Sequence, residues 1–373
     1  MKKLCLSGII IFVSFLMSGC WDQDLLRNAR LVYGEGFDLE ENGKLLSTFV
    51  IRDAPDSEQS GPKNDIINTV SNTPEESRNK ADEEISRLLT TYRNRIVLIG
   101  EEMAKQDIYQ LLDFFYRDPK SALNAKIAVV KGKAADLLSL KKVGNVLIEE
   151  EIDELIKSKE ETTTVPKVTI ESIFPIMKDP GEDFVVPYLI KSGNRVDVSR
   201  AAMFHNHEFT GTLSTNESTM FSLLKGKMGK TAIITQKTNK QQGNKGVYNY
   251  LTFNIEKSKP KMKVLIQKND QIKVRLELKL KVSVLEYPKD YLNEKKVVNR
   301  LNKTLTKEIT NLVNKTLKKM QKARCDGLGV GRQLIAFHPD VWKKQKKDWE
   351  HNYQKVHFVP KVQVEITKKG IIN

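Results

Sequence analysis

The segment Ile272–Val284, IKVRLELKLKVSV, alternates apolar and polar residues without a break. Every second residue is Ile, Val or Leu, and most of the residues between them are charged. Side chains of a strand point alternately to its two faces, so this pattern predicts a strand with one dry and one solvated face. Such strands are typical of antiparallel sheets. The segment therefore predicts a C-terminal antiparallel sheet whose apolar face packs against another element.

The flanking sequence predicts two neighbouring strands and a helix that packs on the apolar face. Residues 247–255 and 361–367 are the predicted neighbouring strands. Residues 290–323 carry apolar side chains at helical spacing and predict one long amphipathic helix over the dry face. Residues 340–354 predict a second helix. The apolar positions of the long helix are Val298, Leu301, Leu305, Ile309, Leu312 and Met320.

The net charge of +15 is unevenly distributed. Residues 226–373 hold 34 Lys or Arg against 12 Asp or Glu, whereas residues 1–225 hold 28 against 35. A basic module of this kind suits an anionic partner, either lipid headgroups or an acidic protein surface. A merely solvated face remains the alternative. The cations lack the interleaved aromatic residues of single-strand nucleic-acid sites, so no nucleic-acid partner is expected.

The N-terminal part predicts a mixed α/β module. Asn42-Gly43 joins two strands in a hairpin, and residues 54–72 are polar enough to predict a mobile loop. Thr73-Pro74 opens a helix that extends to about residue 93. Strand 95–100, helix 101–117 and strand 125–132 then imply a parallel crossover.

The middle of the chain predicts shorter elements. They are an acidic helix over 145–161, a linker over 162–166 and a short helix that stops near Pro175. Hairpins over 185–213 follow, with turns at 192–194 and 206–207. Ser214 and Glu217 form a capping box that opens another helix, and Glu217 is either this cap or a partner contact.

The fold class is therefore mixed α+β, in several modules that each pack a small sheet with helices. The expected units are a signal peptide over 1–19 and modules over 20–160, 161–230 and 231–373.

Cys20 ends the only long apolar run. Lys2-Lys3 precede 14 mainly apolar residues, Leu4–Met17, too few for the roughly 20 that cross a bilayer as a helix. Their length suits a signal peptide, and Ser18-Gly19-Cys20 resembles a bacterial lipobox. Cys20 is then the lipidated first residue of a mature, membrane-anchored chain. Cys5 is removed with the predicted signal peptide, so Cys325 is the one remaining cysteine and no internal disulfide is expected.

Catalytic and cofactor motifs are not evident. His205-Asn206-His207 has a metal-like spacing, but its place in a hairpin favours a turn. Gly327–Gly331 lacks the strand and the Lys-Ser/Thr ending of a phosphate loop, so a flexible turn is expected. The acidic residues around Glu149 suit a solvated helix face. No catalytic residue, metal ligand or cofactor is predicted.

Over nearly its whole length the chain resembles the Ger(x)C lipoproteins, the C subunits of nutrient germinant receptors in spore-forming bacteria, and most closely the GerB-type branch. The residues that carry this resemblance are Gly19–Asp22; Ile99–Lys105, Tyr116–Asp118 and Val130–Ala134; Ala202–Phe204, Gly211–Leu213 and Glu217; and Asp326–Gly329, Trp342 and Trp349.

The resemblance implies a non-enzymatic subunit on the extracytoplasmic face of the spore inner membrane, beside integral-membrane A and B subunits. A small-molecule substrate is not established by it. Candidate partner contacts are Glu217, Lys273, Arg275, Lys279 and Lys281. The alternative is the substrate-binding lipoprotein of an importer, which would have two similar lobes around a deep pocket.

Overall fold

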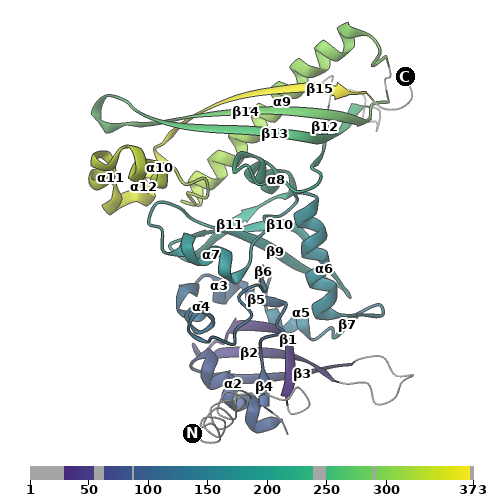
Figure 1. The fold of residues 1–373 in the computed structure, drawn as a ribbon, viewed down its shortest axis with the longest axis vertical. Helices are drawn as coiled ribbons and strands as arrows, with labels where there is room; N and C mark the ends of the chain where they lie inside the picture. The colour runs from purple at the N-terminus through teal and green to yellow at the C-terminus, as the bar shows by residue number, and fades with distance from the viewer. Residues whose placement is uncertain (1–28, 54–62, 86–87, 238–248, 289–290, 370–373) are drawn as a thin grey trace, which may run out of the picture.

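The computed structural model describes residues 29–53, 63–85, 88–237, 249–288 and 291–369. Figure 1 shows an elongated molecule with a large sheet in its lower and middle parts and a smaller sheet across the top. The chain rises from one end to the other as the sequence proceeds.

The large sheet has nine strands in the order β11-β10-β9-β6-β5-β1-β2-β3, with β4 pairing separately with β1. Its parallel centre is β1-β5-β6-β9, and antiparallel hairpins extend it on both sides. The bounds are β1 Ala29–Leu39, β2 Leu45–Asp53, β3 Lys63–Ser71, β4 Leu88–Thr90, β5 Ile96–Gly100, β6 Lys126–Val130, β9 Val185–Ser192, β10 Arg195–His205 and β11 Glu208–Leu213.

Helices cover both faces of this sheet. One face packs against α4 and α7, and the other against α5 and α6. The bounds are α2 Pro74–Glu84, α3 Glu101–Ala104, α4 Ile108–Arg117, α5 Ala134–Leu138, α6 Ile148–Glu161 and α7 Ile170–Met177, with a small ribbon of β7 Lys142–Val143 and β8 Val146–Leu147. The predicted hairpin at Asn42-Gly43 and the parallel crossover from β5 to β6 are both confirmed.

Residues 63–71 form the edge strand β3, where the sequence predicts a loop. Its inward side chains include Asn64, Thr69 and Ser71, which are buried and hydrogen-bonded. A strand that buries polar side chains carries no alternating apolar signal, which explains the error. Residues 54–62 lie outside the described residues.

Three predicted helices are shorter or divided. The helix from Thr73 ends at Glu84, and residues 88–90 pair with β1 instead. Asp107 caps a new helix, so 101–117 is two helices rather than one. Residues 339–354 form α11, a 3-10 turn and α12. Conversely, α7 continues past Pro175 to Met177.

The sheet continues across the predicted boundary between residues 160 and 161. β9, from the predicted middle module, pairs in parallel with β6 at Val129 and Val130. β10 and β11 then extend the same sheet. Whether independently folding units end at residues 160 and 230 therefore stays a prediction.

The small sheet has the order β12-β13-β14-β15 and confirms the predicted strand partners. Its elements are β12 Ile233–Lys237, β13 Tyr250–Ile266, β14 Ile272–Glu286 and β15 His357–Lys368, with helices α9 Lys295–Lys322, α10 Val330–Phe337, α11 Pro339–Gln345 and α12 Trp349–Gln354. The dry face of β14 packs against α9, as the sequence predicts. One expectation is wrong: β15 runs parallel to β14. The crossover through α9–α12 returns the chain to the starting end of β14, which requires the parallel direction.

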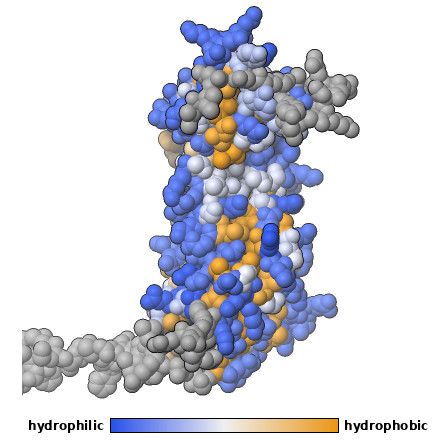
Figure 2. Space-filling view, turned by 90° about the vertical axis from the view of Figure 1, so that its right-hand side faces the viewer, coloured by the Kyte–Doolittle hydropathy of each residue, from blue (hydrophilic) through white to orange (hydrophobic). Residues whose placement is uncertain are grey.

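Helix α8, Thr215–Leu224, lies between the two sheets and contacts α9, β10 and β13. Its Met220 and Leu223 belong to the same core as β14 and α9. One hydrophobic core therefore joins the small sheet to the end of the large one. From the side, Figure 2 shows an upright column that is mostly hydrophilic, with apolar residues gathered along a vertical band.

Candidate partner interface

The solvated face of the small sheet is densely cationic. Register places the polar residues of β13, β14 and β15 on this one side, opposite α9. It carries nine lysine or arginine side chains against two glutamates, Glu277 and Glu365. We call these cations the cationic face: Lys257, Lys259, Lys261, Lys263, Lys273, Arg275, Lys279, Lys281 and Lys361.

Several of these cations lie directly opposite one another on neighbouring strands. The cross-strand pairs are Lys257 with Lys281, Lys259 with Lys279, and Lys263 with Arg275. Like charges at such positions repel and destabilise a sheet. Among the described residues, the ion pair of the cationic face is Lys281 with Glu365, at 3.8 Å between exposed side chains. An acidic surface laid on this face would relieve the repulsion.

The four cations predicted from β14 all lie on this face. Lys273 is half-buried, while Arg275, Lys279 and Lys281 are exposed. The lysines of β13 were missed because the predicted strand stopped at residue 255. Their signal was present, since Lys257 to Lys263 alternate with less polar residues, but Pro260 argues against a central strand. β12 pairs only with residues 250–254, so β13 has an open edge at Pro260.

Glu217 lies inside the fold. Its side chain is 1% exposed and its carboxylate accepts hydrogen bonds from the Ser214 N–H at 2.9 Å and from Lys319 at 2.8 Å. Lys315 pairs with it at 3.0 Å. The capping box is confirmed, and the same carboxylate joins α8 to α9. A partner contact would need an exposed side chain, so the structure favours the cap.

Replacing Glu217 by glutamine should lower stability by about 2 kcal/mol near neutral pH, because the cap survives while both ion pairs are lost. Burial opposes ionisation, yet hydrogen bonds from Lys319, Ser214 and Lys315 hold the pKa of Glu217 at about 2, below the ordinary 4.5. A depressed pKa contributes stability above pH 4.5 that is lost as the pH falls towards 2. Urea unfolding of both proteins from pH 7 to pH 2.5 should show the difference shrinking.

Ser214→Ala is the matched control, because it removes the hydroxyl of the cap and leaves the ion pairs in place. It should cost about 1 kcal/mol and depend on pH less than Glu217→Gln does, because the Ser214 hydroxyl is only one of several groups that lower the pKa of Glu217. Equal stability of wild type and Glu217→Gln at pH 7 would contradict the structural role. Lost germination with unchanged stability would assign Glu217 to a partner contact.

Cys20 lies outside the described residues. Cys325 is a free thiol that is fully buried, and burial raises its pKa above the ordinary value. Its surroundings therefore favour the unreactive, protonated form.

A cleft of about 530 Å³ lies where α7, the β10–β11 turn and α12 meet. His205 contacts Asp183 at 3.1 Å and Glu350 at 3.4 Å, one through each ring nitrogen. The ring of His207 contacts Asp107 and the carbonyl of Met177. Asn206 and His207 have positive φ and form the predicted turn. The nitrogens of His205 and His207 thus have protein partners.

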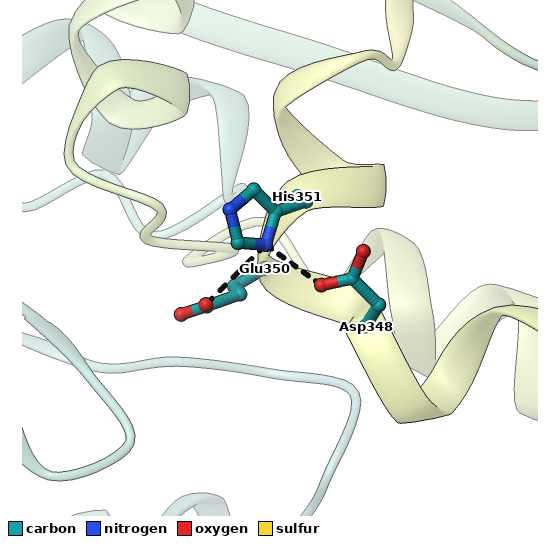
Figure 3. Close-up of side chains that lie close together, drawn as sticks. All are labelled: Asp348, Glu350 and His351. Atoms are coloured by element: carbon teal, nitrogen blue, oxygen red, sulfur yellow. Dashed lines mark hydrogen bonds and ion pairs between the residues drawn. The ribbon is translucent and has the colours of Figure 1, made fainter.

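Figure 3 shows a neighbouring group of three side chains, Asp348, Glu350 and His351. Asp348 and Glu350 line the same cleft. The Nδ1 atom of His351 lies 2.7 Å from Asp348 and 3.4 Å from Glu350. Glu350 also pairs with Arg324 at 3.0 Å. These side chains contact one another within the protein, and they are partly or largely exposed.

Two family models match almost all of the chain. Residues 22–191 match the N-terminal domain of spore germination proteins. Residues 199–370 match the C-terminal domain described as spore germination B3/GerAC-like. The chain belongs to the GerAC-like family of spore germination proteins.

Two relatives of this GerAC-like chain match along nearly their full length. It is 24% identical to the spore germination protein GerQC of Bacillus cereus, covering 97% of this chain and 98% of the relative. It is 21% identical to the spore germination protein B3 of Bacillus subtilis, covering 100% of both.

The crystal structure of the GerBC protein has the same fold, with a TM-score of 0.59 and 18% identity over 90% of this chain and 97% of that one. The predicted mixed fold class is thereby confirmed. In the described part of this GerAC-like chain, we find no helix of the length and apolarity needed to cross a membrane.

Proposed function

We propose that this protein is the C subunit of a nutrient germinant receptor and acts without catalysing a reaction. Its two family matches, which together span residues 22–370, carry this proposal. Lipid on Cys20 would hold it on the extracytoplasmic face of the spore inner membrane, beside integral-membrane A and B subunits. Two or more acyl chains give stable anchoring, whereas one does not.

The cationic face is the surface we assign to a partner subunit. It lies at the top of the molecule, whereas the described chain begins at the lower end (Figure 1). Attraction to lipid headgroups falls off within a Debye length, about 8 Å at physiological ionic strength. A face at the far end from Ala29, where the described chain begins, is therefore better suited to an acidic protein surface than to the membrane.

Charge reversal on this face should weaken recovery of the receptor complex. We would change Lys259, Lys263, Arg275 and Lys279 to glutamate, which keeps like charges opposite each other and so preserves the cross-strand balance. Co-isolation of the A and B subunits from spore membranes should fall at least tenfold, and raising the salt concentration should weaken the wild-type complex.

The matched control reverses four exposed lysines of α9, Lys303, Lys307, Lys318 and Lys322, on the other side of the same sheet. It makes an equal change in net charge and should leave co-isolation unchanged. Recovery that falls equally in both variants would mean that only total charge matters. Undiminished recovery of the face variant would leave the cationic face a solvated surface, and absence of A and B subunits from wild-type isolates would refute the receptor role.

A further inference from the structure

A second cavity, of about 360 Å³, lies at the amino-terminal ends of the parallel strands β5 and β6. Its wall combines side chains from distant parts of the sequence. They are Tyr33 of β1, Arg52 of β2, Arg93 and Arg95 before β5, Lys126 of β6 and Asp153 of α6. The wall therefore carries four cations and one carboxylate.

Two of these cations are balanced by acids of α6. Arg52 contacts Glu149 at 2.6 Å and Glu150 at 2.9 Å. Lys126 contacts both carboxylate oxygens of Glu160, at 2.6 and 2.8 Å. Their charges are thus satisfied without any ligand.

The other two cations, Arg93 and Arg95, are less closely paired. Arg95 lies 3.8 Å from Asp153, a long distance for an ion pair. Among the described residues, Arg93 has no ion pair, and its guanidinium lies 5.9 Å from the centre of the Tyr92 ring. Arg93 is therefore the cation of this wall that has no acid within ion-pair distance among the described residues.

The aromatic ring of Tyr33 lies near two of the guanidinium groups. The ring of Tyr33 has the guanidinium of Arg52 at 4.1 Å and that of Arg95 at 5.9 Å from its centre. The N–H edge of a guanidinium matches the two oxygens of a carboxylate. Tyr33 also supplies an aromatic surface for the rest of a small molecule.

The cavity wall also contains a side-chain amide that has no hydrogen-bond partner among the described residues. Asn94 is 4% exposed, and neither its Nδ2 nor its Oδ1 atom is hydrogen-bonded by another described group. Buried amides are nearly always paired in folded proteins, so an unpaired one beside a cavity favours a polar occupant.

We propose that this cavity binds a small organic monocarboxylate, with its carboxylate on Arg93 and Arg95 and its remaining atoms against Tyr33. Only Arg93 lacks an acid in contact among the described residues, so a monoanion suits this wall better than a dianion such as hydrogen phosphate. Asp153 competes with the ligand for Arg95. This site is independent of the docking role of the cationic face, which lies on the other sheet.

The test measures binding to the full-length protein in detergent at constant ionic strength. Propionate and benzoate are the carboxylate probes, inorganic phosphate is the competing anion and chloride the baseline. Calorimetric titration should give saturable binding of a carboxylate that is tighter than that of phosphate. Tighter binding of phosphate, or no saturable binding of either carboxylate, overturns the proposal.

Two variants should change affinity in opposite directions. Arg95→Gln removes one fork of hydrogen bonds to a charged group and should weaken binding about tenfold or more. Asp153→Asn removes the competing acid and should strengthen binding.

Arg93→Gln, at an exposed residue, repeats the first test with little risk to folding. Lys318→Gln on α9 is the control for lost charge and should bind as wild type. Equal affinity in all four variants would contradict the site.

Discussion

Replacement of Cys20 by alanine should release nearly all of the protein from the membrane. The lipid on this cysteine is the anchor that the N-terminal sequence predicts, and the described part of the chain contains no helix able to cross a bilayer. The leader's apolar run of 14 residues, Leu4–Met17, is also shorter than the roughly 20 needed to span one. The cationic face cannot substitute for it, because lysine contacts are screened by salt.

Labelling with radioactive palmitate and fractionation of washed membranes would measure this release. Cys5→Ala is the matched control, since Cys5 lies within the predicted signal peptide and should not be lipidated. We expect the label and the membrane fraction to be lost together in Cys20→Ala and kept in Cys5→Ala. Unlabelled Cys20→Ala that still fractionates fully with washed membranes would disprove lipid anchoring.

Replacement of Gly331 by alanine should destabilise the junction between the two sheets by about 1–3 kcal/mol. An added Cβ would lie 2.8 Å from the Cα atom of Gly181 and 3.0 Å from its carbonyl oxygen. Both neighbours are backbone atoms, so neither can rotate away. The Arg332 N–H donates to the Gly181 carbonyl at 2.8 Å, and this hydrogen bond would be displaced.

Helix propensity predicts the opposite sign. Gly331 lies in α10, where alanine is intrinsically favoured over glycine by about 1 kcal/mol. Thermal unfolding therefore separates the two effects: a lower melting temperature for Gly331→Ala shows that the backbone contact dominates. Gln333→Ala in the same helix, without that contact, is the control and should change the melting temperature little. A raised melting temperature for Gly331→Ala would show that the two backbones separate freely.

Asp326 shows why this junction is well defined. Its buried carboxylate accepts the N–H groups of Val330 and Gly331 at 2.8 Å each, at the start of α10. Its own N–H donates to Asp183 at 2.7 Å. The segment predicted to be a flexible turn is thus fixed by one acid that contacts both parts of the fold.

Local patterns in the sequence predicted the elements whose signal is periodic. The alternation of 272–284 gave β14, the helical spacing of apolar residues gave α9, and Asn42-Gly43 gave the first hairpin. These features follow from neighbours within one strand or helix, where side-chain direction is set by backbone geometry alone. Family membership was likewise recognisable from the residues themselves, whereas the lipobox stays a prediction.

Tertiary structure decided what depends on distant partners. β3 buries polar side chains against α2 and α6, so its strand is stabilised by hydrogen bonds that no local pattern reveals. The parallel direction of β15 depends on the crossover that precedes it, and the cationic face depends on the register of three strands. The cavity beside Tyr33 gathers residues from five segments, and Glu217 proved buried because α9 covers it. Periodicity determines which residues share a face, whereas only the packed chain determines what that face meets.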